Sequence, residues 1–457
     1  MTYISEKLTL KDSGITWIKE IPKHWDIGIL SNYVQIIASN VDKKKYEDEM
    51  KVLLCNYTDV YYNRFITSTI DFMEASATKS EVEKFSLEIN DVLITKDSET
   101  PDDIAVPSLV NEEIPNLVCG YHLSILRPLM DKLDGKYLLF SIISTSIKSQ
   151  FSSLATGITR YGLSYKHIKN INICVPPLQE QKAIASFLDR KTATIDILIA
   201  KKQRLIQLLE EKRTALINQA VTKGLNPNVP MKDSRIPWIG YIPEHWKAIQ
   251  IRRYIRRIEQ GWSPVAEDRI AQGNEWAVLK LNSVSKGEFH PNEYKVLSED
   301  TKPDKRFEVK HGDLLLSRAN TPQLVGEVCY VKNPPRRLML CDLLYRLDIN
   351  ERLLNKRFCT YYLFSKSGKA QISADARGTS QSMVKISQGH IKTWIIPLPP
   401  SLEEQESIAN YIDGQLAYIK NITHRIIQQI KKLQEYRQSL ITAAVTGKID
   451  IREEVAA

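Results

Sequence analysis

Two short stretches of the chain carry residue types that could take part in catalysis. Asn333-Pro334-Pro335-Arg336 is close to the Asn-Pro-Pro-aromatic loop with which amino-methyltransferases stack on a flipped base. Here Arg336 stands in the aromatic position, and no glycine-rich cofactor loop follows a strand. Asp304, Glu308 and Lys310 resemble the Asp…Glu-x-Lys pattern of nucleases. The three residues between Asp304 and Glu308 are too few to place Asp304 on a strand beside Glu308 and Lys310, where metal-binding carboxylates must converge. Both stretches are interpreted as turn and surface sequence.

The remaining reactive residue types form no catalytic signature. The six cysteines include no C-x-x-C pair and none has a histidine at zinc-finger spacing, so we expect reduced, buried thiols and no metal site. There is no Walker loop, no H-E-x-x-H and no G-x-S-x-G motif. His24 and His245 stand in identical Ile-Pro-x-His-Trp contexts, for which a structural role is favoured.

The composition is that of a folded protein of several domains. The chain has 457 residues, 43% of them apolar and 26% charged, which excludes disordered, collagen-like and disulfide-scaffold classes. Neither a membrane span nor a signal-peptide core is found, so a cytoplasmic protein is expected. The net charge of +9 is compatible with nucleic-acid binding, but most of the excess lies in the two helical segments described below.

The chain repeats itself at an offset of about 222 residues. Lys-Asp-Ser and Trp-Ile-x-x-Ile-Pro-x-His-Trp occur at 11–25 and again at 232–246, and the strand-like run 91–96 returns at 313–318. Pro-Pro-Leu-Gln-Glu-Gln at 176–181 returns, with one residue inserted, at 399–405. The frame is kept while the interiors differ. A shared scaffold with two variable interiors suggests two sites that read different things, although duplication followed by neutral drift stays open.

Each repeat ends in a segment with the pattern of a long helix. No Gly or Pro occurs between Glu180 and Lys223, Gly224 follows, and the second segment stops at Gly447. Apolar residues recur every seven positions, which predicts coiled-coil seams. Leu198 and Leu205 are assigned to the companion position of the first helix. The seam residues are Leu188, Ile195, Leu209 and Leu216 in the first helix and Ile412, Ile419, Ile426, Leu433 and Leu440 in the second.

The segment before each helix has a mixed pattern. Short apolar runs such as 51–54, 91–95 and 313–317 predict strands, and 137–150 and 358–370 predict one short helix each. We therefore expect an α+β protein with two α/β domains in tandem. The expected boundaries are 1–178 and 226–402 for these domains, 179–225 and 403–448 for the two helices, and 449–457 for a C-terminal tail.

The doubled motifs resemble the specificity subunit of Type I restriction–modification enzymes. The Trp-Ile…Ile-Pro-x-His-Trp openings, the Pro-Pro-Leu-x-Glu-Gln helix starts and the Ala-Val-Thr helix ends cover nearly the whole chain in the family's order, twice. The resemblance implies two target-recognition domains separated by two helices that pack as an antiparallel coiled coil with pseudo-two-fold symmetry. It also implies a bipartite, asymmetric DNA target, with one half read by each domain and the half-site spacing set by the helix pair.

The resemblance further implies a subunit without catalysis or cofactor of its own. Its expected partners are double-stranded DNA, two modification subunits that use S-adenosylmethionine, and restriction subunits that use ATP and Mg²⁺. A rival interpretation is a repeat-built adaptor that binds protein partners through its coiled coil, without reading DNA sequence. A fused methyltransferase is the third possibility.

Candidate DNA-contacting residues are the polar, basic and aromatic side chains on loops next to the repeated frame, because such residues reach base edges and phosphates. For any single one of them, an ordinary solvated surface role is about as favoured. The candidates of the first domain are Lys43, Tyr57, Lys96, Ser98, Thr100, Arg160 and Tyr161. Those of the second domain are Arg252, Arg253, Arg256, Arg257, Trp262, Ser263, Arg318, Asn320, Gln323, Thr379, Ser380, Gln381 and Lys385.

Overall fold

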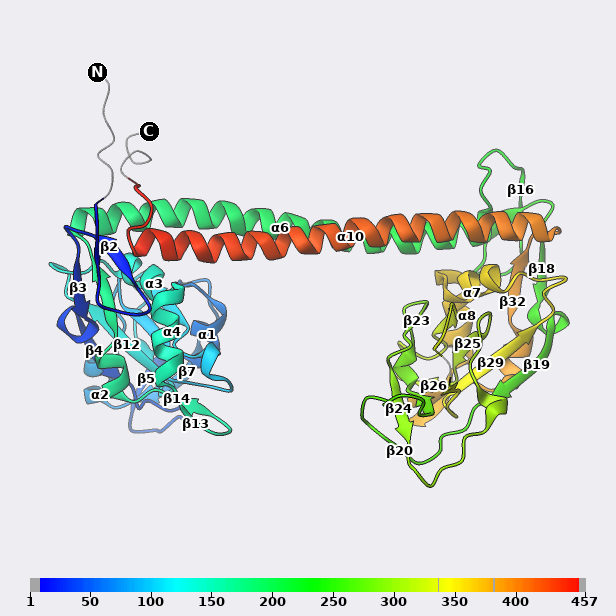
Figure 1. The fold of residues 1–457 in the computed structure, drawn as a ribbon, viewed down its shortest axis with the longest axis horizontal. Coiled ribbons are helices and arrows are strands. Elements are labelled where there is room, and N and C mark those ends of the chain that lie inside the picture. Colours follow the sequence, from blue (N-terminus) through cyan, green and yellow to red (C-terminus); the bar gives the residue numbers. More distant parts are fainter. Residues whose placement is uncertain (1–8, 336, 381–382, 452–457) are drawn as a thin grey trace, which may run out of the picture. The chain divides into compact units, whose positions relative to one another are not determined.

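The computed structural model describes residues 9–335, 337–380 and 383–451, and its chain divides into two units (Figure 1). Unit 1 consists of Met1–Gln203 and Ile427–Ala457, and unit 2 consists of Arg204–Ile426. Each unit therefore combines one mixed domain with a portion of both long helices, α6 (Leu178–Lys223) and α10 (Leu402–Val445). The mixed helix-and-sheet architecture agrees with the fold class expected from the sequence.

The two long helices form where the sequence predicts them. Helix α6 has 46 residues and α10 has 44, since both segments are rich in helix-forming residues and bounded by proline at the start. Gly224 and Gly447 adopt left-handed φ values of +74° and +66° just after the helices end, as is common for glycine at helix C-termini.

Within each unit the two helices run antiparallel. In unit 1, Lys202 Nζ donates to Gln429 Oε1 at 2.6 Å, and Arg437 Nε lies 2.9 Å from Asp196 Oδ1. As residue numbers rise along α6, the residue numbers of their partners in α10 fall, which is the arrangement of antiparallel helices. In unit 2, Ile217 of α6 shares one apolar core with Ile412 of α10.

The predicted seam positions lie on the packed side of both helices. All nine are buried or half-buried: Leu188, Ile195, Leu209, Leu216, Ile412, Ile419, Ile426, Leu433 and Leu440. The companion position assigned to Leu198 and Leu205 is wrong, because these side chains are 41% and 44% exposed. Thr192, Ile199 and Ile206 are buried or half-buried instead. The second seam position of α6 is therefore Thr192, three residues before Ile195, and not Leu198, three residues after it. Thr192 and Ile195 lie on neighbouring turns of one helix face.

The domain of unit 1 is built around a five-stranded sheet of order β4-β12-β8-β10-β6 and a three-stranded sheet of order β11-β5-β7. Buried aliphatic residues from both sheets form two apolar cores. The strands are β1 Leu10–Asp12, β2 Glu20–Pro22, β3 Asp26–Ile29, β4 Val34–Ala38, β5 Met50–Cys55, β6 Phe65–Ile66, β7 Met73–Ala77, β8 Val92–Thr95, β9 Asp97–Ser98, β10 Pro107–Val110, β11 Leu117–Cys119, β12 Leu123–Pro128, β13 Thr156–Gly157, β14 Tyr161–Gly162 and β15 Asn172–Val175.

The domain of unit 2 repeats this topology. Its sheets have the orders β19-β29-β25-β27 and β20-β24-β21-β28, so β20 is added, and among the described residues no strand equivalent to β6 pairs at the edge. The strands are β16 Met231–Asp233, β17 Tyr241–Pro243, β18 Lys247–Gln250, β19 Ile255–Gln260, β20 Ala266–Glu267, β21 Ala277–Leu279, β22 Val284–Ser285, β23 Glu288–Phe289, β24 Tyr294–Leu297, β25 Leu314–Ser317, β26 Ala319–Asn320, β27 Val328–Tyr330, β28 Leu338–Met339, β29 Leu344–Ile349, β30 Arg377–Ser380, β31 Met383–Lys385 and β32 Ile395–Leu398.

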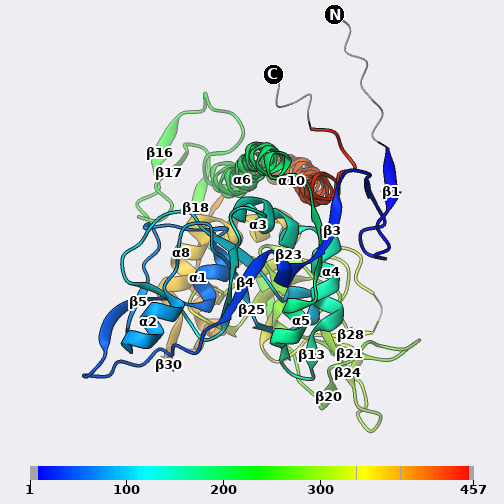
Figure 2. The same cartoon turned by 90° about the vertical axis from the view of Figure 1, so that its left-hand side faces the viewer.

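The short helices correct one expectation in each unit. Where a single helix was expected, the structure has two, because Ser144 and Ser365 each end one helix and cap the next. In unit 1, Gln438 of α10 donates to the carbonyl oxygen of Ile143 at 2.9 Å, and Figure 2 shows α3 below the two long helices. The short helices are α1 Tyr57–Tyr62, α2 Lys79–Phe85, α3 Gly135–Ile143, α4 Thr145–Leu154 and α5 Tyr165–Lys169 in unit 1, and α7 Lys356–Phe364, α8 Lys366–Asp375 and α9 Gln388–Thr393 in unit 2.

The repeated His-Trp pair fastens the start of each domain to the first turn of its long helix. In unit 1, Trp25 Nε1 donates to Glu180 Oε2 at 2.9 Å, and His24 Nε2 lies 2.9 Å from Glu180 Oε1. Unit 2 repeats the arrangement, with Trp246 Nε1 donating to Glu404 Oε1 at 2.9 Å. The structural role favoured for the histidines is therefore confirmed, and it is a hydrogen-bonded one.

The same contact takes the place of a capping box at the start of α10. Ser401 Oγ does accept from the Glu404 backbone N–H at 3.1 Å. The Glu404 carboxylate binds His245 and Trp246 instead of reaching back toward the helix start.

Candidate nucleic-acid interface

In each unit a small three-stranded sheet gathers candidate residues from separate parts of the chain. The orders are β13-β14-β9 in unit 1 and β30-β31-β26 in unit 2. In both units one backbone hydrogen bond joins the end of the small sheet to the residue that follows β8 or β25. Leu163 N–H donates to Lys96 O, and Ile386 N–H donates to Arg318 O, both at 2.9 Å. Figure 1 shows β13 and β14 at the end of unit 1 remote from α6 and α10.

In unit 1 this sheet carries an arginine held by a carboxylate. Arg160 Nη2 donates to Asp97 Oδ1 at 2.7 Å, while His122 Nδ1 lies 2.7 Å from Asp97 Oδ2. The Arg160 side chain stays 61% exposed. A partly exposed guanidinium oriented in this way keeps N–H groups free for a base edge or a phosphate.

Beside Arg160, helix α1 supplies a cluster of tyrosines. Tyr57 and Tyr61 stack with ring centroids 5.5 Å apart and an angle of 17° between planes. Tyr61 Oη donates to Asp103 Oδ2 at 2.7 Å, and this hydrogen bond raises the pKa of Tyr61 to about 12. Tyrosines, carboxylates and the arginine line one cavity: Tyr57, Thr58, Tyr61, Tyr62, Asp97, Ser98, Glu99, Asp103, Thr159 and Arg160.

Other unit 1 candidates are held inside the protein. Ser98 is buried and its hydroxyl donates to Thr100 O at 2.5 Å. Lys96 Nζ donates to Ser39 O at 3.2 Å, and burial holds its pKa below the ordinary value. Tyr161 packs against the domain core. The structure therefore leaves Lys43, Thr100 and Arg160 as the more exposed side chains of the set.

In unit 2 the four neighbouring arginines Arg252, Arg253, Arg256 and Arg257 form two pairs with different surroundings. Arg256 Nη2 donates to Asn350 Oδ1 at 2.9 Å, and Arg257 Nη2 lies 3.1 Å from Glu259 Oε1. Arg252 and Arg253 are exposed on a 3₁₀ turn, Ile251–Arg253. Within the described part of the chain neither of their guanidinium groups has a hydrogen-bond or ion-pair partner.

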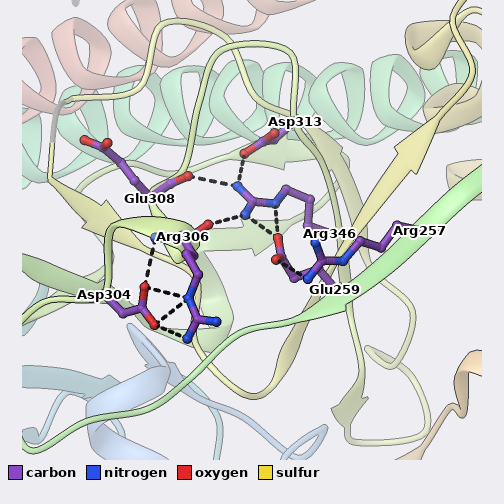
Figure 3. A network of polar contacts seen from close by, with 7 residues as sticks. All are labelled: Arg257, Glu259, Asp304, Arg306, Glu308, Asp313 and Arg346. Atoms are coloured by element: carbon purple, nitrogen blue, oxygen red, sulfur yellow. Dashed lines mark hydrogen bonds and ion pairs between the residues drawn. The ribbon is translucent and has the colours of Figure 1, made fainter.

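Arg257 lies at the outer side of a network centred on Arg346 (Figure 3). Arg346 binds Glu259 with Nε at 2.9 Å and also through Nη2, and its Nη1 donates to Asp313 Oδ2 at 3.0 Å. Its remaining bonds go to the carbonyl oxygens of Glu308 and Arg306, at 2.8 and 2.7 Å. This network fastens the loop before β25 to β29, so its role is structural.

The acidic residues near this network do not form a metal site. Asp304 binds the side chain of Arg306, and Glu308 Oε1 accepts from Arg337 N–H at 3.2 Å. No group of three metal-ligating side chains is found within residues 9–335, 337–380 and 383–451. The six cysteines are free and buried, as expected.

The other unit 2 candidates follow β19 or β25 or lie in the small sheet β30-β31-β26. Arg318 lies over the ring of Tyr345, 6.0 Å from its centroid. Asn320 Oδ1 accepts from Thr321 N–H at 2.8 Å, and Ser263 Oγ donates to Asp342. Trp262, Gln323 and Lys385 are exposed, Thr379 and Ser380 lie in β30, and Gln381 lies outside the described residues.

Sequence reasoning did not identify Asp97 and Asp103 as parts of this surface. Their contacts join residues 42 to 63 positions apart, and no local pattern marks such pairs. The available signal in the sequence is the polar run that follows residues 91–96, because it places the carboxylates of Asp97 and Glu99 close to the end of β8.

Comparison with known proteins identifies the family. The family model described as "Type I restriction modification DNA specificity domain" matches residues 23–207 and 258–432. The chain belongs to this family. The two matches follow the two repeats, so the resemblance read from the doubled motifs is confirmed.

Full-length relatives support the assignment. The chain is 24% identical over 440 residues to a putative type I restriction enzyme MjaX specificity subunit of Methanocaldococcus jannaschii, covering 96% of each chain. It is 24% identical to the Escherichia coli EcoKI specificity subunit, covering 94% of this chain and 90% of the relative. A solved structure of an HsdS subunit from Thermoanaerobacter tengcongensis matches with 17% identity and a TM-score of 0.53, over 94% of this chain and 98% of that one.

A second solved structure shows the same fold. It comes from work on complex assembly and conformational transition of the type I R-M system, and it matches with a TM-score of 0.70 and 15% identity over 94% of this chain and 99% of that one. Within the described residues, no helix has the length and apolarity needed to cross a bilayer.

Proposed function

We propose that this chain is the sequence-specific DNA-recognition subunit of a Type I restriction–modification complex. The observation that carries the proposal is a comparison of the two repeats, which share their frame contacts and differ in the residues of their small sheets. Frame contacts such as Trp25–Glu180 and Trp246–Glu404 are the same in both units, whereas the residue types on the two small sheets differ. Two similar domains with unlike exposed surfaces are suited to reading two unlike half-sites.

The chain itself supplies recognition and no catalytic step. The proposed partners are double-stranded DNA, two modification subunits that carry S-adenosylmethionine, and restriction subunits that use ATP and Mg²⁺. The family match supports these partners. The specificity subunits of Methanocaldococcus jannaschii and Escherichia coli are named as parts of type I restriction enzymes.

The decisive experiment is a map of methylated adenines in the host genome, before and after deletion of the gene for this chain. We expect a split motif with two unlike halves that disappears on deletion and returns when the gene is restored. A methylation pattern unaffected by deletion would contradict the proposal and favour the adaptor interpretation, which predicts no sequence-selective binding to DNA.

The helix pair is proposed to set the distance between the two half-sites. Adding one heptad to α6 after Ala200 and one to the facing part of α10 lengthens the pair by about 10 Å at 1.5 Å per residue, which equals roughly 3 base pairs at 3.4 Å each. The methylated motif of this variant should keep both halves and gain a longer unread gap. A changed half-site with an unchanged gap would contradict the ruler.

A further inference from the structure

The most exposed large apolar side chain in the described part of unit 1 is Ile158, at 92% exposure. It lies at the tip of the hairpin formed by β13 and β14, where Thr156 pairs with Gly162 and Gly157 pairs with Tyr161. An isoleucine at a solvent-exposed tip contributes nothing to the core. Single exposed apolar side chains are common, so a binding role for Ile158 depends on how the tip is held and on its surroundings.

The hairpin tip is held in one conformation. Gly157 has φ +153°, and a Cβ at this residue would lie 1.9 Å from the carbonyl oxygen of Arg160, so only glycine allows the turn to close. On the other side of Ile158, Arg160 is fixed by Asp97 at 2.7 Å. The chain thus presents Ile158 from a narrow, preorganised support, which lowers the entropy cost of binding through it.

The charges around the tip favour base edges over phosphates. The cavity next to the hairpin is lined by Asp97, Glu99 and Asp103, with Arg160 as its cation. Three carboxylates disfavour a phosphate group. Asp97 and Asp103 already bind Arg160, His122 and Tyr61, and the exposed Glu99 can accept a hydrogen bond from the amino group of cytosine or adenine. Since the major groove floor carries one apolar group, the C5-methyl of thymine, this is the chemistry that fits an exposed isoleucine.

We propose that Ile158 is a specificity-determining residue of unit 1 that contacts a thymine methyl group in the major groove of one half-site. This inference rests on the proposed function. The second unit has Thr379 at the corresponding place after its own glycine, Gly378, a smaller side chain with a hydroxyl. The different residue types at these two positions accord with two unlike half-sites.

The test removes the methyl group from the DNA and the side chain from the protein. The full chain is assembled with its modification subunits, and duplexes carrying deoxyuridine in place of each thymine of the mapped target are titrated. For the wild type, one thymine in one half-site should show about a fourfold loss of affinity, which corresponds to ~0.8 kcal/mol per buried methyl group. Ile158→Ala should lose affinity for the thymine duplex and no longer distinguish thymine from uracil at that position.

Ile270→Ala is the matched control, because Ile270 is 83% exposed on a loop of unit 2. This variant should keep the wild-type response to uracil at the thymine assigned to Ile158. The inference is overturned if Ile158→Ala binds like the wild type, if its loss is equal on thymine and uracil duplexes, or if the half-site contains no A·T pair. Selective binding that persists in these cases leaves the proposed function standing, whereas absence of any half-site selectivity in the wild type contradicts the proposed function itself.

Discussion

Replacing Arg346 with methionine tests whether the network of Figure 3 stabilises unit 2. The Arg346 side chain is 14% exposed, and those of its partners Glu259 and Asp313 are each 15% exposed. Arg346→Met removes the charge from between two nearly buried carboxylates while keeping much of the apolar side-chain volume. Breaking a buried ion pair from one side costs about 3–5 kcal/mol. Because Arg257 still neutralises part of the Glu259 charge, we expect a loss near 3 kcal/mol, at the lower end of that range.

The assay is hydrogen exchange of the native protein, which gives an opening free energy for each strand. The amides of β25 and β29 should lose about 3 kcal/mol of protection, while those of β8 and β12 in unit 1 should keep theirs. Arg257→Met is the matched control, since Arg257 makes an ion pair with the same Glu259 but is 72% exposed. Its expected effect is under about 1 kcal/mol. Equal effects of the two variants, or a loss under about 1 kcal/mol for Arg346→Met, would refute the assignment of a structural role.

Three further predictions follow from the contacts and pKa values. Trp25→Phe removes the indole N–H bond to Glu180 and should lower the free energy of unfolding by about 1–2 kcal/mol in urea titrations, whereas Trp17→Phe, at 48% exposure, should change it by less than about 0.5 kcal/mol. Burial raises the pKa of Asp413, but hydrogen bonds from Lys332, Tyr361 and Arg357 outweigh it and hold the pKa below the ordinary value. The stability from Asp413 is therefore present above its unfolded pKa of about 3.9 and lost as pH falls through its folded pKa, so Asp413→Asn should flatten the acid limb of urea midpoints measured between about pH 2.5 and 5. Burial raises the pKa of Cys174, Cys341 and Cys359 to about 12, so a thiol reagent at pH 8 should label the native protein slowly and all six cysteines rapidly in denaturant.

The elements that follow local rules could be predicted from the sequence. The first long helix was predictable because a run without glycine or proline ends at Gly224, and the second because a run interrupted only by Gly414 ends at Gly447. The seam of α10 was predictable because its isoleucines recur every seven residues. The companion seam of α6 was not. Leu198 and Leu205 are more apolar than Thr192, and hydrophobicity alone cannot show that α6 turns Thr192 toward its partner.

Side-chain partners within the candidate interface could not be predicted, because they depend on which segments the sheets bring together. Arg256 and Arg257 were grouped with Arg252 and Arg253 as one basic cluster, yet Arg256 binds Asn350, 94 residues away. The strand alternation of β19 and the pairing of β19 with β29 decide this contact. All four arginines are exposed, but the sheet pairing gives Arg256 and Arg257 intramolecular partners, whereas Arg252 and Arg253 have none among the described residues.

The motifs that identify the family are therefore informative about the scaffold and uninformative about the DNA target. Gln181 and Gln405 each accept a backbone N–H at 2.8 Å and donate to the carbonyl of a proline just before their helix, Pro176 and Pro399 respectively. Asp91 and Asp313 each bind an arginine, Arg127 and Arg346, from the neighbouring strand. Every one of these contacts satisfies buried polar groups of the frame, which explains why both repeats keep them. The target must then be encoded where the repeats differ, as at Ile158, which is exposed, and at Thr379, which takes its place in the second repeat. Variants that exchange exposed tips between target-recognition domains should change one half-site while leaving assembly intact, and variants in the repeated motifs should impair folding before they alter specificity.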